Sequence, residues 1–122
     1  MDKLTKQRAF DYSMYVMLTS YFENAVCISD LQRKKLSLAY QELKDEEKDS
    51  FDTQSISVIE KELLPNLPLD FTRQKMKLSL VGSDDRMHTE VRLSNDAYVV
   101  RIKARYAKNG SGLVHEVWKK TA

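Results

Sequence analysis

Residues 98–106 decide the fold, and they read Tyr-Val-Val-Arg-Ile-Lys-Ala-Arg-Tyr. Apolar and basic side chains alternate along this stretch, with Arg101, Lys103 and Arg105 at every second position. A period of two is typical of a β-strand that has one face on a core and the other in solvent. We therefore expect a strand that is apolar on one face and cationic on the other.

The same alternation continues on both sides of this strand. Residues 75–80, 87–93 and 113–118 read as three further strands, separated by turn residues at 82–85, 94–96 and 109–112. Such short connections favour antiparallel pairing, so we predict a four-stranded antiparallel β-meander at about residues 74–119. Its apolar face should consist of Met76, Leu78, Leu80, Met87, Val91, Leu93, Tyr98, Val100, Ile102 and Tyr106.

The first half of the chain has helical periodicity. Phe10, Met14, Met17 and Tyr21 recur at helical spacing, which predicts a helix over about residues 4–25. A second helix should begin at Asp30, after the capping-box spacing of Ser29 and Gln32, and bury Leu36, Tyr40 and Leu43. The run 44–50 has no apolar residue and is expected to be an exposed turn or a frayed helix end. A third, shorter helix should bury Ile56, Ile59 and Leu63 and stop at Pro65 and Pro68.

These elements predict one α+β domain over residues 1–122, in which about three helices at 3–65 pack on one face of the four-stranded meander. The composition, with 42% hydrophobic and 31% charged residues, is typical of a compact domain. Cys27 is the single cysteine and cannot form an internal disulfide. There is no signal-like or membrane-spanning apolar run, so we expect a cytoplasmic protein without a membrane partner.

The two halves of the chain differ in charge. Residues 1–70 contain 9 Lys and Arg against 13 Asp and Glu, whereas residues 71–122 contain 11 against 5. Cations on the solvent face of the sheet would attract a polyanion, and an aromatic side chain beside them could stack on bases. The expected nucleic-acid-binding residues are Lys75, Lys77, Arg92, Arg101, Lys103, Arg105 and Trp118.

No catalytic or metal-binding motif is present in the sequence. GxGxxG, Walker, HExxH and CxxC patterns are absent, and His88 and His115 lie on different expected strands, so no cofactor, metal or catalytic residue is predicted. A metal-free ribonuclease would need only an acid–base group and cations, which His88, His115, Tyr106, Arg101 and Arg105 could supply. The order of helices followed by an Arg-rich meander resembles the RelE family of messenger-RNA-cleaving toxins, although the family's opening strand is missing here. A small ribonuclease of toxin type is therefore one functional alternative.

Two tyrosines of the first helix lie off its apolar stripe. Tyr12 and Tyr15 are candidate partner-binding residues, because aromatic side chains often anchor protein interfaces. The preferred function is a small non-enzymatic accessory protein that binds nucleic acid through the basic sheet face. A protein-binding inhibitor or adaptor, encoded by a phage or another mobile element, is the second alternative, so the expected partner is nucleic acid or a nucleic-acid-handling protein. The sequence leaves the oligomeric state open, and a dimer is among the alternatives.

Overall fold

The computed structural model describes residues 3–22, 26–27, 30–67, 77–82, 89–106 and 112–119. Its helical part comprises α1 (Lys3–Tyr21), α2 (Asp30–Gln41) and α3 (Asp45–Val58), followed by a π-helical turn η1 (Ile59–Leu63) and a 3-10 turn η2 (Leu64–Asn66). Its strands are β1 (Val26–Cys27), β2 (Lys77–Gly82), β3 (Thr89–Ser94), β4 (Tyr98–Arg105) and β5 (Gly112–Lys119). The α+β class with an antiparallel sheet is therefore confirmed. None of the described helices has the length and apolar character that crossing a membrane requires.

The strands form one sheet in the order β1-β2-β3-β4-β5. Strands β2 to β5 are antiparallel neighbours, whereas β1 pairs in parallel with β2 through Val26 and Cys27. The sequence did not predict β1, because two residues are too few to show an alternating pattern. Its parallel direction is possible because α2 and α3 lie between β1 and β2 in the chain.

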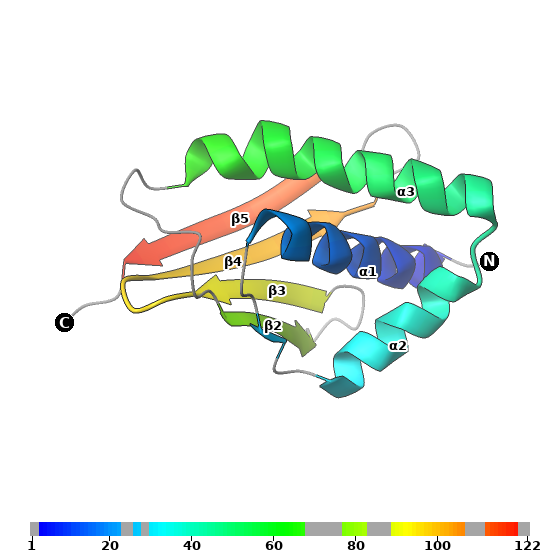
Figure 1. The fold of residues 1–122 in the computed structure, drawn as a ribbon, viewed down its shortest axis with the longest axis horizontal. Coiled ribbons are helices and arrows are strands. Elements are labelled where there is room, and N and C mark those ends of the chain that lie inside the picture. Colours follow the sequence, from blue (N-terminus) through cyan, green and yellow to red (C-terminus); the bar gives the residue numbers. More distant parts are fainter. Residues whose placement is uncertain are drawn as a thin grey trace.

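The helices cover one face of this sheet, as Figure 1 shows. Helix α1 lies in the middle of the helical layer, where it contacts both other helices as well as β3 and β4. Helix α2 contacts β2, and η1 contacts β5. The helical layer therefore extends across the sheet, and none of the described helices lies on the opposite face of the strands.

The core lies between the two layers. Phe10 of α1, Phe51 of α3 and Tyr106 after β4 form an aromatic cluster, in which the ring centroids of Phe10 are 6.0 Å from Phe51 and 5.6 Å from Tyr106. The expected apolar sheet face is confirmed where its side chains are described, with Tyr106 half-buried against the core. Met76, Met87 and the side chain of Leu80 lie outside the description. The buried members of that face are Leu78, Val91, Leu93, Tyr98, Val100 and Ile102.

Helix α3 begins earlier than the sequence predicted. The polar run expected to be an exposed turn contributes only its first residue to the turn, because Asp45–Ser50 form the first half of α3. Three acidic residues, Asp45, Glu46 and Glu47, occupy the first turn, where the helix dipole favours negative charge. The Glu47 carboxylate also accepts a hydrogen bond from the backbone N–H of Lys44 at 3.3 Å. Capping therefore starts a helix that hydrophobic periodicity did not reveal.

This earlier start also changes which face of the third helix is buried. The buried stripe is Phe51, Ser55, Val58, Ile59 and Leu63, and it continues through the π-helical turn. Ile59 and Leu63 are buried as predicted, but Ile56 was assigned wrongly, since 36% of it is exposed. The pattern that began at Ile56 omitted Phe51, which sets the true direction of the buried face.

Hydrogen bonds to two side chains, those of Asn95 and Gln7, hold the two ends of β4. The side-chain Oδ1 of Asn95 accepts hydrogen bonds from the backbone N–H groups of Ala97 and Tyr98, both at 2.8 Å, and closes the predicted turn between β3 and β4. At the other end of β4, the side-chain Oε1 of Gln7 accepts the backbone N–H of Tyr106 at 2.9 Å. Gln7 is buried, so α1 holds the end of this strand through a hydrogen bond inside the core.

Candidate nucleic-acid interface

The face of the sheet opposite the helices carries the predicted cations. In β3 and β4 the side chains alternate between buried apolar residues and exposed or half-buried basic residues. Because neighbouring residues of a strand point to opposite faces, the basic side chains lie on the face away from α1. We call this set the outer basic face, and its members are Lys77, Arg92, Arg101, Lys103 and Arg105.

The register brings two of these cations directly opposite each other. Arg92 of β3 pairs with Arg101 of β4, and Arg92 also faces Ser79 of β2. Like charges at directly opposed positions destabilise a sheet by a few tenths of a kcal/mol up to about 1 kcal/mol. On β5 the residue opposite Arg101 is Glu116, which brings an acid into the same row of strand positions. Both arginines also interact with other residues of the chain.

The other predicted interface residues are placed less completely. Lys75 lies outside the described residues. Trp118 belongs to β5, where its backbone is the register partner of Val99. Val99 in turn pairs with Ser94, and Ser94 pairs with Lys77, so Trp118 and Lys77 stand in the same row across the sheet. The structure thus brings five of the six predicted cations to one face, with Trp118 in the row of Lys77, and the next row on this face is that of Arg92 and Arg101.

No family model, curated protein or solved structure matches the chain. The arrangement of its own residues is therefore the basis for any functional proposal.

The residues proposed for a metal-free ribonuclease are not assembled in the described part of the chain. His115 is the register partner of Ile102, a buried position on the helix side, whereas Arg101 and Arg105 belong to the outer basic face. Tyr106 packs its ring on Phe51 at 4.5 Å, and His88 lies outside the described residues. Among the described residues there is also no group of three His, Cys, Asp or Glu side chains that could hold a metal ion.

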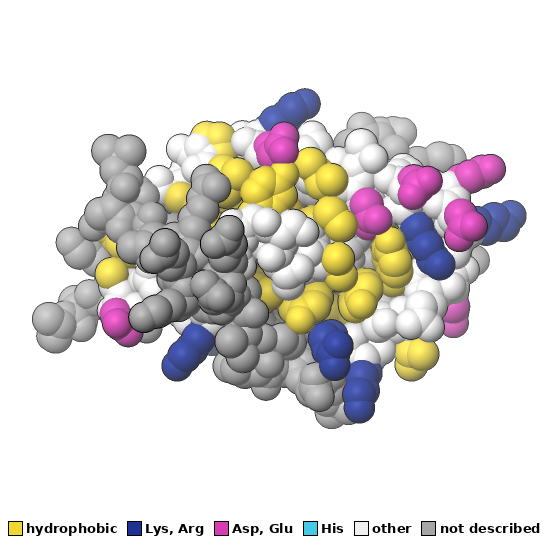
Figure 2. Space-filling model, viewed as in Figure 1, with side chains coloured by type: hydrophobic (Ala, Val, Ile, Leu, Met, Phe, Trp, Pro, Cys, Tyr) yellow, Lys and Arg dark blue, Asp and Glu magenta, His cyan; other side chains and the backbone are white. Residues whose placement is uncertain are grey.

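Tyr12 and Tyr15 lie in the helical layer. Both are half-buried, and the ring centroid of Tyr12 is 6.2 Å from Tyr15 and 5.2 Å from Tyr40 of α2. Figure 2 shows hydrophobic side chains exposed along the middle of the helical layer, with Asp and Glu gathered toward one end. Tyr12 therefore joins α1 to α2 within the molecule, and the partner-binding role of both tyrosines stays a prediction.

Sequence reasoning missed Asp52, a polar side chain that connects the helices of the helical layer. Its Oδ1 accepts a hydrogen bond from Ser13 Oγ at 2.7 Å, and its Oδ2 accepts one from the Tyr40 hydroxyl at 2.9 Å. Ser13 Oγ also lies 2.9 Å from Ser55 Oγ. Asp52 thus links all three helices. Its sequence position, directly after Phe51, gave no signal of this role, because its partners lie up to 39 residues away.

This network fixes the chemical state of Tyr40. Burial, together with the hydrogen bond to Asp52, raises the pKa of the Tyr40 hydroxyl to about 12. The hydrogen bond to Glu60 raises the pKa of Tyr21 in the same direction. Both hydroxyls are protonated at neutral pH, as an ordinary tyrosine is, and each donates a hydrogen bond between helical segments.

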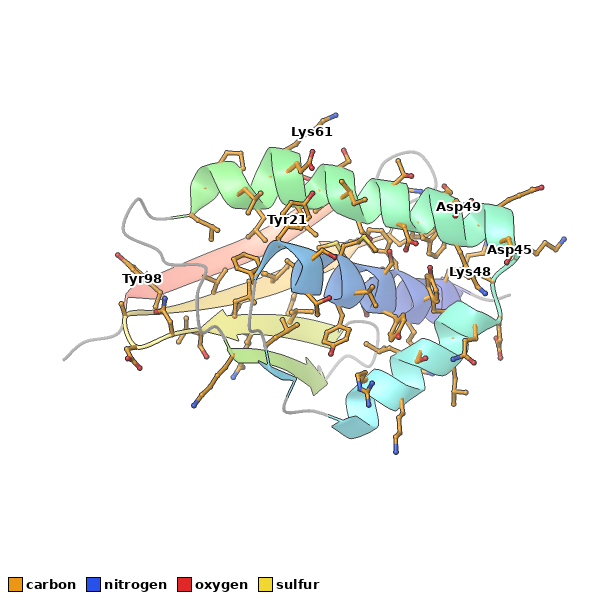
Figure 3. All side chains as sticks on the ribbon, viewed as in Figure 1. Tyr21, Asp45, Lys48, Asp49, Lys61 and Tyr98 are labelled. Atoms are coloured by element: carbon orange, nitrogen blue, oxygen red, sulfur yellow. The ribbon has the colours of Figure 1, made fainter. Side chains whose placement is uncertain are left out.

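We expect Asp52→Ala to lower the free energy of unfolding by about 2 kcal/mol, because it removes a charged acceptor from two hydrogen bonds. Urea denaturation followed by circular dichroism measures this loss as a lower midpoint. Asp49→Ala is the matched control, since Asp49 is an exposed carboxylate one turn earlier on the same helix (Figure 3). Its change should stay within about 0.5 kcal/mol. Equal midpoints for the two variants would show that the network does not stabilise the helical layer.

Proposed function

We propose that the chain is a small non-enzymatic accessory protein that binds nucleic acid through the outer basic face. The observation that supports this proposal is the clustering of five cations on the face of the sheet opposite the helices. The described residues of β2 to β5 include two acidic residues, Glu90 of β3 and Glu116 of β5, and both are at register positions of this face. A phosphate backbone is a regular row of negative charges and would gain from contacts with such a face.

The spacing of these cations suits a polyanion better than a single anion. Residues two apart on a strand are separated by about 6.8 Å and neighbouring strands by about 4.8 Å. These separations are within the Debye length of about 8 Å at physiological salt, so the cations act as one electrostatic field. Consecutive phosphates on one strand of nucleic acid can therefore contact several of them at once.

Direct titration tests this proposal. Wild-type protein is added to fluorescently labelled single-stranded RNA, single-stranded DNA and duplex DNA at low salt, and anisotropy reports binding. We expect micromolar binding, with quenching of the single tryptophan, Trp118, that is stronger for single strands because only unpaired bases are free to stack.

The same titration with labelled polyglutamate distinguishes a nucleic-acid partner from an acidic protein partner. Binding of polyglutamate without binding of any nucleic acid would reject the proposal in favour of that alternative. If neither probe binds at micromolar concentration, the outer basic face has no polyanion-binding role.

A further inference from the structure

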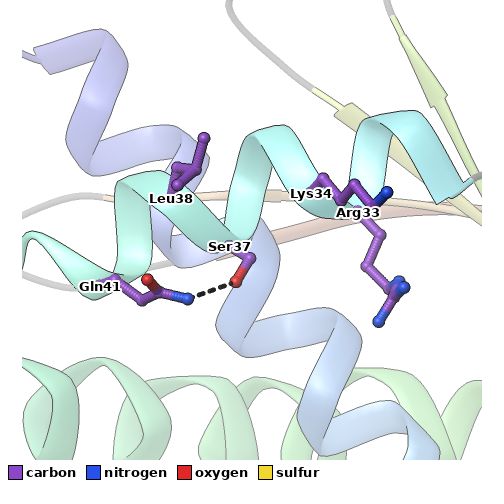
Figure 4. Close-up of a pocket in the computed structure, with 5 residues that line it drawn as sticks. All are labelled: Arg33, Lys34, Ser37, Leu38 and Gln41. Atoms are coloured by element: carbon purple, nitrogen blue, oxygen red, sulfur yellow. Dashed lines mark hydrogen bonds between the residues drawn. The ribbon is translucent and has the colours of Figure 1, made fainter.

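Helix α2 exposes a large apolar side chain. Leu38 is 65% exposed, the highest value for a large hydrophobic residue among the described residues. A shallow hollow of about 300 Å³ lies against the same helix, and its lining consists of Arg33, Lys34, Ser37, Leu38 and Gln41 (Figure 4). A partner that covers this leucine and fills the hollow would remove apolar surface from water, which is favourable.

The charges on this surface are arranged symmetrically about Leu38. Lys34 lies four residues before it and Glu42 four residues after it, and both are exposed. Residues four apart share one face of a helix, so these three side chains form one stripe along α2 and its first residue beyond the C-terminus. Reversed end to end, the stripe presents the opposite order of charges. It is therefore complementary to a second copy of itself.

We propose that α2 is the contact of a weak homodimer, in which two copies of the helix pack antiparallel about a two-fold axis at Leu38. In such a contact each residue meets the position equally far on the other side of the axis. Lys34 of one copy then faces Glu42 of the second copy, and Glu42 faces the second Lys34. The two leucines meet at the centre, and each fills the hollow beside the other.

The hydrogen bond within α2 supports this geometry. Gln41 Nε2 donates to Ser37 Oγ at 3.0 Å, so one donor of the amide is used within the helix next to Leu38 (Figure 4). The leucines then occupy the centre of the contact beside this hydrogen-bonded amide, with the charged pairs at the two ends. Glu42 lies where the chain leaves α2, and its backbone N–H donates to Ala39 at 3.3 Å. This bond keeps Glu42 close to the last helical turn.

The size of the surface sets the expected strength. One helix pair buries much less than the roughly 1,200 Å² of the smallest stable interfaces, so the dimer should be weak, with a dissociation constant of about 0.1–1 mM. The contact uses the helical layer and not the outer basic face. It therefore does not depend on the proposed binding of nucleic acid.

Charge reversal provides the test, with sedimentation equilibrium up to about 1 mM protein as the readout. Lys34→Glu and Glu42→Lys should each weaken dimerisation about tenfold or more, because each places like charges at both ends of the contact. The double variant K34E/E42K should dimerise like the wild type. An equimolar mixture of the two single variants should form the heterodimer in preference to either homodimer.

Lys61→Glu is the matched control. Lys61 is exposed on η1, on the side of α3 away from α2 (Figure 3), and its reversal should leave dimerisation unchanged. Circular dichroism verifies that each variant is folded. A monomeric wild type at about 1 mM would overturn the proposal. So would a dimer that neither single reversal weakens, or a double variant that remains monomeric.

Discussion

The triple variant R101Q/K103Q/R105Q should lose most of the salt dependence of nucleic-acid binding. Each phosphate contact that a protein loses reduces the slope of log affinity against log salt by about 0.9 for duplex DNA, so removing three cations should flatten the slope by about three units. At low salt this corresponds to an affinity loss on the order of a hundredfold or more. Anisotropy titrations at several salt concentrations between 50 and about 500 mM measure the slope directly.

The control is a variant in which three lysines of the helical layer, instead of the sheet face, are changed to Gln. Lys35, Lys44 and Lys61 are exposed and belong to α2, the turn before α3 and η1. Changing all three to Gln alters the net charge equally, but it should reduce the slope by less than about one unit because these residues do not contact the phosphates. The control variant should melt within a few degrees of the wild type, since exposed charges contribute little to stability. Circular dichroism verifies that the sheet variant is folded, because Arg101 and Lys103 are half-buried. Equal slopes for the two variants would mean that the sheet face is not the binding surface.

Phe10→Ala should be the most destabilising of the substitutions considered. Phe10 is fully buried and meets the edge of Phe51 at an interplanar angle of 77°. Its removal would leave a cavity where α1, α3 and β4 meet, and such changes typically cost about 3–5 kcal/mol. Domains of this size are stable by about 5–15 kcal/mol, so the variant should be close to unfolding at room temperature.

Urea denaturation at low micromolar protein provides the measurement, with Leu38→Ala as its control. Leu38 is exposed in the monomer, and its truncation should change stability by less than about 0.5 kcal/mol. Phe10→Leu keeps much of the buried volume, so its loss of stability should lie between those of Leu38→Ala and Phe10→Ala. A Phe10→Ala variant as stable as Leu38→Ala would show that the aromatic cluster is not the centre of the core.

The sequence alone determined the elements whose periodicity is strong and local. Alternation in residues 98–106 identified β4, its buried face and its cationic face, because a strand shows every second side chain to the same surface. Apolar spacing likewise identified α1 and α2, and Asp30 was the correct start of α2. The candidate interface could be named from the sequence for the same reason, since all its cations lie on alternating strand positions.

Only the tertiary structure decided the features that depend on contacts between distant segments. The run 44–50 lacks apolar residues, and its helical state follows from acidic side chains at a helix N-terminus and from Phe51 reaching the core. The role of Asp52 depends on Ser13 and Tyr40, which neither precede nor follow it at helical spacing. The opposition of Arg92 and Arg101 is a matter of register, and the position of Tyr12 against Tyr40 is a matter of helix packing. Periodicity assigns a residue to a face of its own element, whereas its partner on the next element depends on how the layers pack together.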